Sequence, residues 1–175
     1  MGKFNLYDSI SILEKTPSVL QILLTGLPEN WVNQRENEEI WSVFDIVGHL
    51  VHGEITDWIP RAKIILETGK EQAFAPFDRF AQFDESKGKN INQILEEFKH
   101  LRSENLNQLR ELNLQSEDLL REGLHPDLGV VKLEQLLATW VVHDLGHIRQ
   151  IARVLAKNYK SEIGAWEKYL PVVNE

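Results

Sequence analysis

The sequence of 175 residues contains no cysteine. This absence excludes disulfide bonds, thiolate metal sites and a cysteine nucleophile, and it agrees with a reducing compartment. No apolar run approaches the roughly 18 residues that a membrane-spanning helix requires. The N-terminal residues also lack the long apolar core and the small-residue cleavage site of a signal peptide. We therefore expect a soluble, cytoplasmic protein that does not associate with membranes.

Basic residues are also scarce, because 19 Lys and Arg residues stand against 27 Asp and Glu residues, for a formal net charge of −8. They are scattered along the chain and form no stripe. Such a surface repels phosphate backbones, which argues against a nucleic-acid partner. A chain of this length fits one domain, here residues 1–175, and such a domain buries roughly 70% of the surface of its unfolded chain.

Apolar residues recur at helical spacing in four regions of the chain. These regions cover residues 10–24, 42–69, 91–112 and 133–157. The sequence shows no convincing strand pattern, no internal repeat and no low-complexity segment. Four long helices with short or packed connections predict an all-α four-helix bundle, and bundles of this kind often build metal sites in their cores.

Capping and breaking signals locate the ends of the first two helices. Thr16 and Pro17 break the first region and restart it, with Thr16 as the cap and Pro17 at the first helical position. Ser42 and Asp45 predict an acidic variant of the capping box, and we favour this role for Asp45 over a role in a functional site. Pro60 predicts a kink in the second helix, because it removes a backbone hydrogen bond.

Two connections differ in composition. Residues 70–89 show no clear period but contain Phe74, Phe77 and Phe80. A polar linker would not carry so many aromatic residues, so we expect this segment to pack over the bundle or at a subunit contact. Residues 123–129, with two glycines and a proline, have the chemistry of a turn.

His143 and His147 stand four residues apart in the fourth predicted helix, so their side chains lie one turn apart on a face that Gln150 shares. Two neutral imidazoles in this arrangement can bind one divalent ion at about 2.0–2.1 Å. The spacing also fits an incidental pair on a solvated surface. The surroundings favour the metal site, because a buried histidine needs a polar partner and the neighbours are apolar: Val141, Val142, Leu145, Ile148 and Ile151.

The second predicted helix offers a third ligand, because it contains both His49 and His52. Their side chains point about 60° apart on a helix, and either can face the fourth helix. We interpret His52 as a group that lines the pocket or that supports the ligands from outside the ligand set, rather than as a ligand. Gly48 and Gly53 flank this stretch. They let an ion or a substrate approach the helix, or they let another helix pack closely.

Asp144 follows His143 directly, so the stretch superficially resembles the His-Glu-x-x-His motif of zinc proteases. That interpretation is poor, because Asp is shorter than Glu and no histidine follows His147 to supply a third ligand. We interpret Asp144 either as a group that orients an imidazole from outside the ligand set or as a charge at the helix margin. We interpret His100 as a solvated surface residue and His125 as a turn residue.

Further residues near the candidate ligands are candidates for catalysis or for binding a substrate. The candidates for proton transfer or for hydrogen bonds to a substrate are His52, Asp144 and Gln150. Trp41, Trp58 and Trp140 either line a pocket or belong to the core, and we favour the core because large aromatic residues on bundle helices usually pack there.

Four segments, in their order and spacing, resemble the DinB-like superfamily of metal-binding four-helix bundles, which includes the YfiT-like proteins. These segments are residues 16–28, Trp41-Ser42, Gly48-His49-Leu50 and residues 136–151. The resemblance covers most of the chain. It implies a single DinB-like bundle domain, and it implies a homodimer, because many members of the family form one.

The resemblance also implies the ligand set and the chemistry. By resemblance, the ligands of a divalent ion are His49, His143 and His147, and the ion is zinc or nickel. Members of the superfamily include metal-dependent hydrolases, and also transferases and isomerases that use a low-molecular-weight thiol. A thiol of this kind would reach this cysteine-free protein as a cosubstrate.

Three neutral histidines leave a divalent ion its full charge and at least one open coordination position, as in catalytic zinc sites. Our leading hypothesis is therefore a metal-dependent thiol S-transferase or hydrolase that acts on a small molecule. The alternative is a metal-binding or ligand-binding module, active in a stress response without turnover. The third hypothesis is a structural helical protein whose histidines are incidental.

Overall fold

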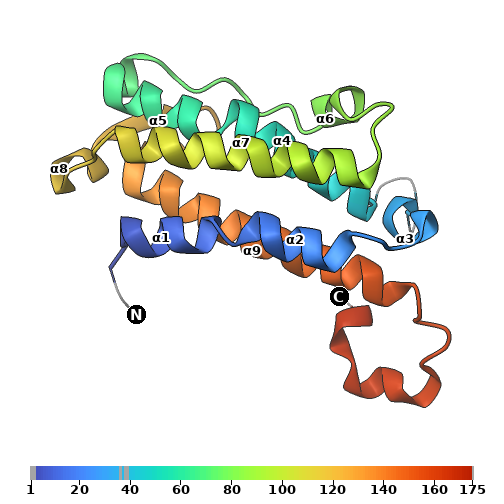
Figure 1. Ribbon diagram of the computed structural model, residues 1–175. Coiled ribbons are helices and arrows are strands. Elements are labelled where there is room, and N and C mark those ends of the chain that lie inside the picture. The colour runs from blue at the N-terminus through green and yellow to red at the C-terminus, as the bar shows by residue number, and fades with distance from the viewer. Residues whose placement is uncertain (1–2, 36, 38–39, 175) are drawn as a thin grey trace.

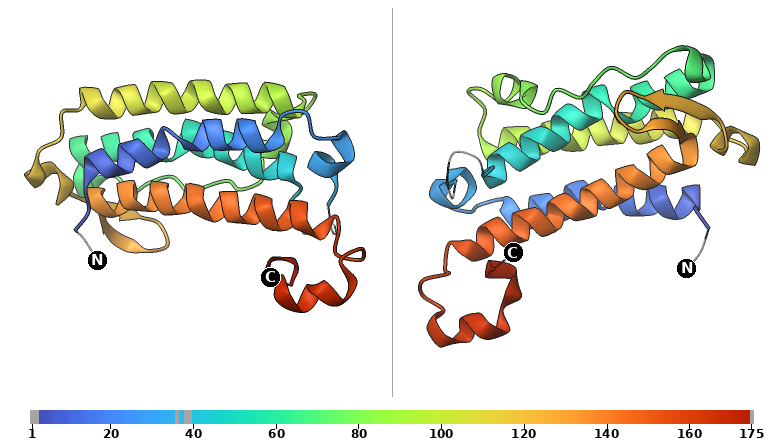
Figure 2. Two further views of the ribbon diagram at one scale, coloured as in Figure 1. Left: turned by 60° about the horizontal axis from the view of Figure 1, so that its bottom comes forward. Right: turned by 180° about the vertical axis from the view of Figure 1, so that it is seen from behind.

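The computed structural model describes residues 3–35, 37 and 40–174 of the chain. Its long helices form four rows, which confirms the predicted all-α four-helix bundle (Figure 1). The helices are α1 (Leu6–Leu13), α2 (Thr16–Leu24), α3 (Glu29–Asn33), α4 (Val43–Thr56), α5 (Trp58–Glu67), α6 (Ala81–Glu85), α7 (Ile91–Glu111), α8 (Ser116–Leu119) and α9 (Leu133–Lys157). Helices α1 and α2 share one row, α4 and α5 share another, and α7 and α9 form one row each (Figure 2). No helix in this described part of the chain has both the length and the apolar character needed to cross a bilayer.

The first two rows are each interrupted, for different reasons. Pro17 stands in the first turn of α2, but it is the second residue of the helix and not the first as predicted. The cap residue is Lys15 and not Thr16, which is buried inside the helix. The second predicted helix is two helices, because the chain bends at Asp57, where φ is −103° and ψ is −69°. Pro60 has no N–H to donate to the carbonyl of Thr56, so the break falls one turn before the proline.

The start of α4 has the predicted capping box. The Ser42 side chain accepts a hydrogen bond from the Asp45 backbone N–H at 3.1 Å, and the Asp45 carboxylate accepts one from the Ser42 N–H at 2.8 Å. Arg35 also donates to both oxygens of Asp45, each at 2.8 Å. Asp45 is therefore engaged at the helix start, in the role favoured from the sequence.

The connection after α5 packs over the bundle as predicted. It contains a short 3-10 helix, η1 (Gly69–Glu71), and α6, and Phe74 within it is only 2% exposed. Helix α6 lies so close to α4 that a Cβ atom on Gly48 would stand 2.6 Å from the side-chain oxygen of Gln82 and 2.8 Å from that of Ser86. Gly48 thus permits close helix packing, which was one of the two roles proposed for it.

A two-stranded antiparallel hairpin was not predicted. It consists of β1 (Glu122–His125) and β2 (Gly129–Lys132), with His125 paired to Gly129 next to the turn. The expected turn is present, but strands of four residues are too short to show a period in the sequence. The segment after α5 joins this hairpin, because the Phe74 N–H donates to the Leu124 carbonyl at 2.9 Å. The expectation of no strand was therefore wrong.

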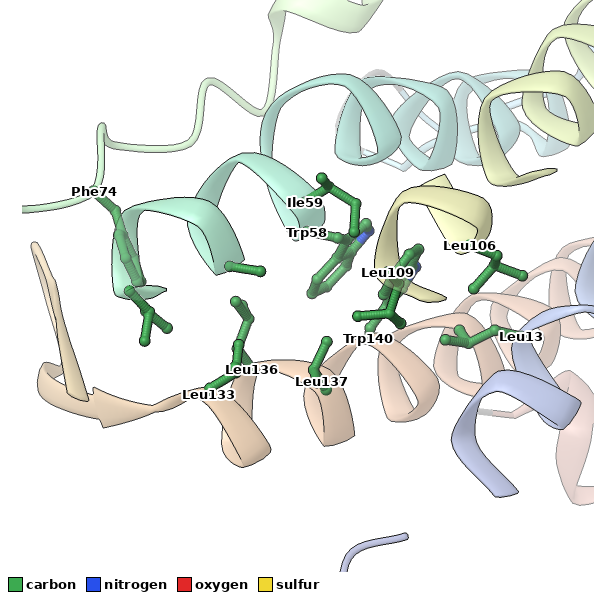
Figure 3. Close-up of a cluster of buried hydrophobic side chains, with 12 residues drawn as sticks. Leu13, Trp58, Ile59, Phe74, Leu106, Leu109, Leu133, Leu136, Leu137 and Trp140 are labelled. Carbon is green, nitrogen blue, oxygen red and sulfur yellow. The ribbon is translucent and has the colours of Figure 1, made fainter. Parts of the chain in front are cut away.

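Two clusters of buried side chains fill the bundle. One surrounds Trp58 and Trp140, between α5, α7 and α9 (Figure 3). The other lies between α2, α4 and α7 and includes Ile46, Leu50 and Phe98. Beyond α9, two 3-10 helices, η2 (Gly164–Tyr169) and η3 (Pro171–Val173), form a loop at one end of the bundle (Figure 1). The histidines of interest lie between α4 and α9, near the middle of the bundle.

Candidate metal centre

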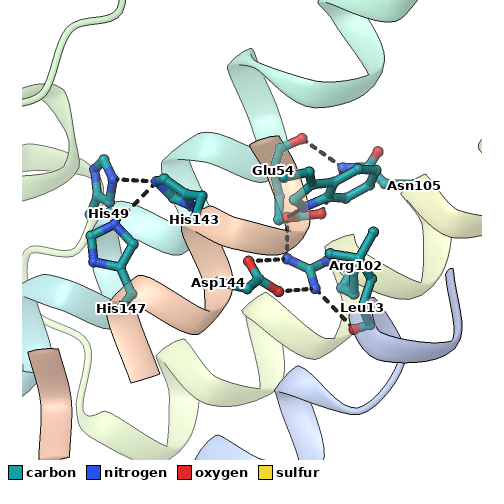
Figure 4. A network of polar contacts seen from close by, with 9 residues as sticks. Leu13, His49, Glu54, Arg102, Asn105, His143, Asp144 and His147 are labelled. Carbon is teal, nitrogen blue, oxygen red and sulfur yellow. Dashed lines mark hydrogen bonds and ion pairs between the residues drawn. The ribbon is translucent and has the colours of Figure 1, made fainter. Parts of the chain in front are cut away.

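His49 on α4 and the α9 pair His143 and His147 point their Nε2 atoms at one another (Figure 4). The Nε2 atom of His143 lies 3.0 Å from that of His49 and 3.1 Å from that of His147. Ligands at about 2.0–2.1 Å from a tetrahedral ion lie about 3.3 Å from one another. Small side-chain movements therefore suffice to seat an ion among the three nitrogens.

Burial keeps these three imidazoles neutral. Desolvation, reinforced by the neighbouring histidines, lowers the pKa of His49 to about 3 and that of His143 to about 2. The pKa of His147 is also lowered by burial, although Gln150 and Asp144 act in the opposite direction. Neutral imidazole is the form that ligates a metal, so the histidines carry available lone pairs at neutral pH.

Gln150 determines which nitrogen of His147 faces the other histidines. Its side-chain oxygen lies 2.8 Å from Nδ1 of His147, so Nδ1–H donates to Gln150 and Nε2 carries a lone pair. Within the described residues, Nδ1 of His49 and Nδ1 of His143 are buried without a hydrogen-bond partner. Each neutral imidazole carries one N–H, and His147 donates its own to Gln150. The three Nε2 atoms therefore have too few N–H groups to hydrogen-bond to one another, and a cation among them would accept their lone pairs instead. The donor set therefore fits a divalent metal ion.

Aromatic rings hold the imidazoles in place. The centroid of Trp41 lies 5.0 Å and that of Phe77 5.2 Å from the His49 ring, while Trp58 lies 5.1 Å from the His143 ring. Trp41 and Trp58 each line a pocket at the histidines. Trp140 stacks on Trp58 with centroids 5.6 Å apart and is fully buried. Trp140 therefore belongs to the core, as we favoured for the tryptophans. Trp58 belongs to the core and also lines a pocket.

His52 lies outside the convergence of nitrogens. Its ring is buried, contacts Phe77 and has Nδ1 2.9 Å from the carboxylate of Glu85. It lines neither of the pockets that reach the other histidines. Helix spacing alone allowed either His49 or His52 on α4 to face α9. In the structure, His49 meets the α9 pair.

Asp144 occupies a different environment from either one that we proposed for it. It is 0% exposed, so the interpretation as a charge at the helix margin is wrong. Both of its oxygens accept hydrogen bonds from Arg102, at 2.6 and 3.0 Å, so they do not bind an imidazole (Figure 4). Its influence on His147 is electrostatic, since its charge acts to raise the pKa of that ring.

Arg102 is the centre of a buried ionic network that sequence reasoning missed. Its guanidinium also donates to Glu54 at 2.7 Å, and Glu54 accepts further hydrogen bonds from Trp140 Nε1 and Asn105. Burial lowers the pKa of Arg102, but the two carboxylates raise it by more. A signal was present in the sequence, because Arg102 and Asn105 interrupt the apolar face of α7 at core spacing.

Among the pockets that the described residues line, an apolar one and a polar one reach the histidines. The apolar chamber, of about 420 Å³, touches all three histidines. Its apolar walls are Trp58, Phe74, Phe77, Leu128, Val131 and Leu136. The polar pocket, of about 390 Å³, touches two of the histidines and is lined otherwise by residues that include Trp41, Arg79, Gln150 and Arg153. The candidate metal position is thus accessible from two sides. His100 lies on the surface as expected, whereas the turn residue His125 also lines the apolar chamber.

Comparison with known proteins agrees with this arrangement. A family model of the DinB superfamily matches residues 12–151, which include all three converging histidines. The chain belongs to the DinB superfamily. Among solved structures, this DinB-superfamily chain is similar to YfiT from Bacillus subtilis, with 25% sequence identity and a TM-score of 0.74 over 88% of this chain and 87% of that chain. YfiT is described as a probable metal-dependent hydrolase with an unusual four-helix bundle topology. No curated protein matches this member of the superfamily.

Proposed function

We propose that the protein is a metal-dependent hydrolase that acts on a small molecule, with zinc or nickel held by His49, His143 and His147. The observation that carries this proposal is the convergence of three neutral Nε2 atoms, 3.0 and 3.1 Å apart, at a position that two pockets reach. Membership of the DinB superfamily and the similarity to YfiT support it.

The residues around the centre have defined parts in this proposal. When bound, a divalent ion supplies a Lewis acid that polarises a carbonyl or phosphoryl group and lowers the pKa of a water molecule. Three protein ligands are the number found in catalytic rather than structural zinc sites. Gln150 holds the tautomer of His147. His52, bound to Glu85, and Asp144, bound to Arg102, support the two helices that carry the ligands.

A second candidate function is transfer of a low-molecular-weight thiol. The observation that favours it is that two pockets meet at the histidines, so two molecules can approach from different sides. In this reaction the sulfur of the thiol forms a bond to an electrophilic carbon of the second molecule. The leaving group departs with its electron pair, and the thiol proton passes to solvent.

Metal analysis of protein purified without a histidine tag tests the centre. We expect about one equivalent of zinc or nickel per chain, and its loss in the double variant His143→Ala/His147→Ala. His100→Ala is the matched control, because His100 lies on the surface of α7 beside Glu104. Equal metal content in the double variant and the control would overturn the metal centre.

Turnover assays test the chemistry. The metal-loaded protein is screened with esters, amides, phosphoesters and alkyl halides, with and without added thiol. Hydrolysis that disappears in His49→Ala and persists in His100→Ala supports the hydrolase, and turnover that requires the thiol supports the transferase. A fully loaded protein that converts no compound would instead support the metal-binding module without turnover.

A further inference from the structure

The apolar chamber extends away from the histidines along α9. Gln135, Thr139, His143 and His147 all line it and recur every four residues, so they form one face of the helix. Twelve residues of helix span about 18 Å. The candidate metal position therefore lies at one end of an elongated chamber, whose volume of about 420 Å³ falls in the usual range of about 300–1,000 Å³ for small-molecule sites.

The polar side chains that line the chamber away from the histidine trio are engaged with protein partners. Arg61 and Asp57 form an ion pair at 2.8 Å, so their charges balance. The Nδ1 atom of His125 accepts hydrogen bonds from the backbone N–H groups of Asp127 and Leu128, at 3.1 and 3.2 Å. Among the described residues that line this region, no unbalanced charge is available to pair with a charged group of a ligand.

The hairpin and the segment before α6 form one wall of the chamber. The bridge between Ala73 and Leu124 holds them side by side. Gly123 lets the hairpin pack closely, because a Cβ atom there would stand 2.7 Å from a carbon of Ile65 and 3.0 Å from the ring of Phe74. This wall places Leu128, at the turn, over the chamber. The chamber is thus assembled from α4, α5, the segment before α6, the hairpin and α9.

We propose that the apolar chamber binds an uncharged alkyl or aryl group of the substrate. The scissile bond then lies at the histidines, and the uncharged group extends along α9 toward Gln135. This inference rests on the proposed hydrolase function and deepens it by naming the substrate class, namely esters or amides that carry an apolar, uncharged group. Burial of such a group against aromatic and aliphatic walls supplies the binding free energy.

Two fluorescent probes of matched shape test the chamber without requiring turnover. N-phenyl-1-naphthylamine is neutral, and 8-anilinonaphthalene-1-sulfonate has the same ring skeleton with one added negative charge. We expect the neutral probe to bind with a stoichiometry of one per chain and the sulfonate to bind at least tenfold more weakly. Titrations of the protein as purified are repeated after treatment with a chelator, so that attraction of the sulfonate to bound metal is separated from binding in the chamber.

Two substitutions and their matched controls locate the bound probe. Thr139→Trp fills the chamber from α9, and Leu128→Asp places a charge on its wall; each should weaken binding of the neutral probe at least tenfold. Val142→Trp on the outer face of α9 and Val130→Asp on the exposed face of the hairpin are the controls, since both residues are exposed and neither lines the chamber. Equal binding in the substituted proteins and their controls, equal binding of the two probes after chelation, or no binding of the neutral probe overturns the proposal.

These results are distinguishable from a failure of the proposed function. Protein that binds the neutral probe in the chamber but retains no metal overturns only the hydrolase. Protein that hydrolyses small esters through His49 but binds no neutral probe overturns only the chamber. Where hydrolysis is found, straight-chain acyl esters should show kcat/KM rising at least tenfold from acetyl to hexanoyl. Thr139→Trp should abolish this rise, and the control Val142→Trp should keep it.

Discussion

Asp144 and His143 are neighbours in sequence, but their side chains leave α9 in different directions and bind different partners. His143 turns toward His49, at 3.0 Å between Nε2 atoms, while Asp144 turns into the core and accepts two hydrogen bonds from Arg102 (Figure 4). Successive helical residues point about 100° apart, so one turn of α9 serves both the candidate metal centre and the buried ionic network. The network thereby fixes the rotation of α9 that presents the histidines to α4.

Replacing Arg102, the positively charged residue of this network, should destabilise the fold strongly. In Arg102→Met, Glu54 and Asp144 remain buried without their cation, and loss of one partner from a buried ionic network typically costs about 3–5 kcal/mol. Urea denaturation measures the change. Arg110→Met is the control, because Arg110 pairs with Glu14 at the surface and exposed pairs contribute at most about 1 kcal/mol. Equal losses in the two variants would contradict the importance of the network.

Removing the hydrogen-bond partner of His147 should weaken metal binding while the fold persists. In Gln150→Leu, Nδ1–H of His147 loses its acceptor, and losses of such outer partners typically reduce metal affinity about 10–100-fold. Competition with a chromophoric chelator measures the affinity. Gln108→Leu, on α7 and outside the pockets at the histidines, should bind metal like the unsubstituted protein. A Gln150→Leu protein of unchanged affinity would exclude this role.

The metal-free protein should lose stability as the pH falls from neutrality. Burial holds the pKa of His49 at about 3 and that of His143 at about 2, whereas the same side chains in the unfolded chain titrate near about 6.5. Between these values the unfolded chain binds protons that the folded chain does not bind. Stability is therefore fully present above about pH 6.5 and declines as the pH falls toward the folded values.

Urea unfolding of metal-free protein at pH 7.5 and pH 5.0 measures this effect. The midpoint should be lower at pH 5.0, and the difference should shrink in His143→Leu, which removes one of the buried titrating groups. His100→Leu, at the surface, should leave the difference unchanged. A His143→Leu protein with the full pH dependence would show that the buried imidazoles do not cause it.

Gly123→Ala should destabilise the protein through the wall of the apolar chamber. Its Cβ atom would meet Ile65 at 2.7 Å and Phe74 at 3.0 Å, and both side chains are buried. Such overpacking typically costs about 1–3 kcal/mol. Gly146→Ala is the opposite case, because nothing lies within 4 Å of its Cβ position on α9, and alanine is favoured over glycine in a helix by up to about 1 kcal/mol. In thermal unfolding, Gly123→Ala should melt at a lower temperature than the unsubstituted protein, and Gly146→Ala should melt at a higher temperature.

Much of the fold follows from local patterns in the sequence. The apolar period of residues 91–112 and 133–157 predicts α7 and α9 almost to their ends, and Ser42 with Asp45 predicts the start of α4. These predictions succeed because helix spacing and capping depend on residues within a few positions of one another. The spacing of His143 and His147 is local in the same sense, so one helix determines that they share a face.

Other features depend on contacts between distant segments. Helix spacing alone left His49 and His52 open, and the family resemblance favoured His49. The rotation of α4 against α9 brings His49 to the pair, while His52 contacts Glu85. The hairpin is stabilised by Phe74, fifty residues before Leu124, so no short stretch reveals it. The sequence by itself determined the helices and the histidine pair through short-range periodicity. Only the tertiary structure determined the third histidine, the burial of Asp144 against Arg102 and the apolar chamber, because each depends on packing between helices far apart in the chain.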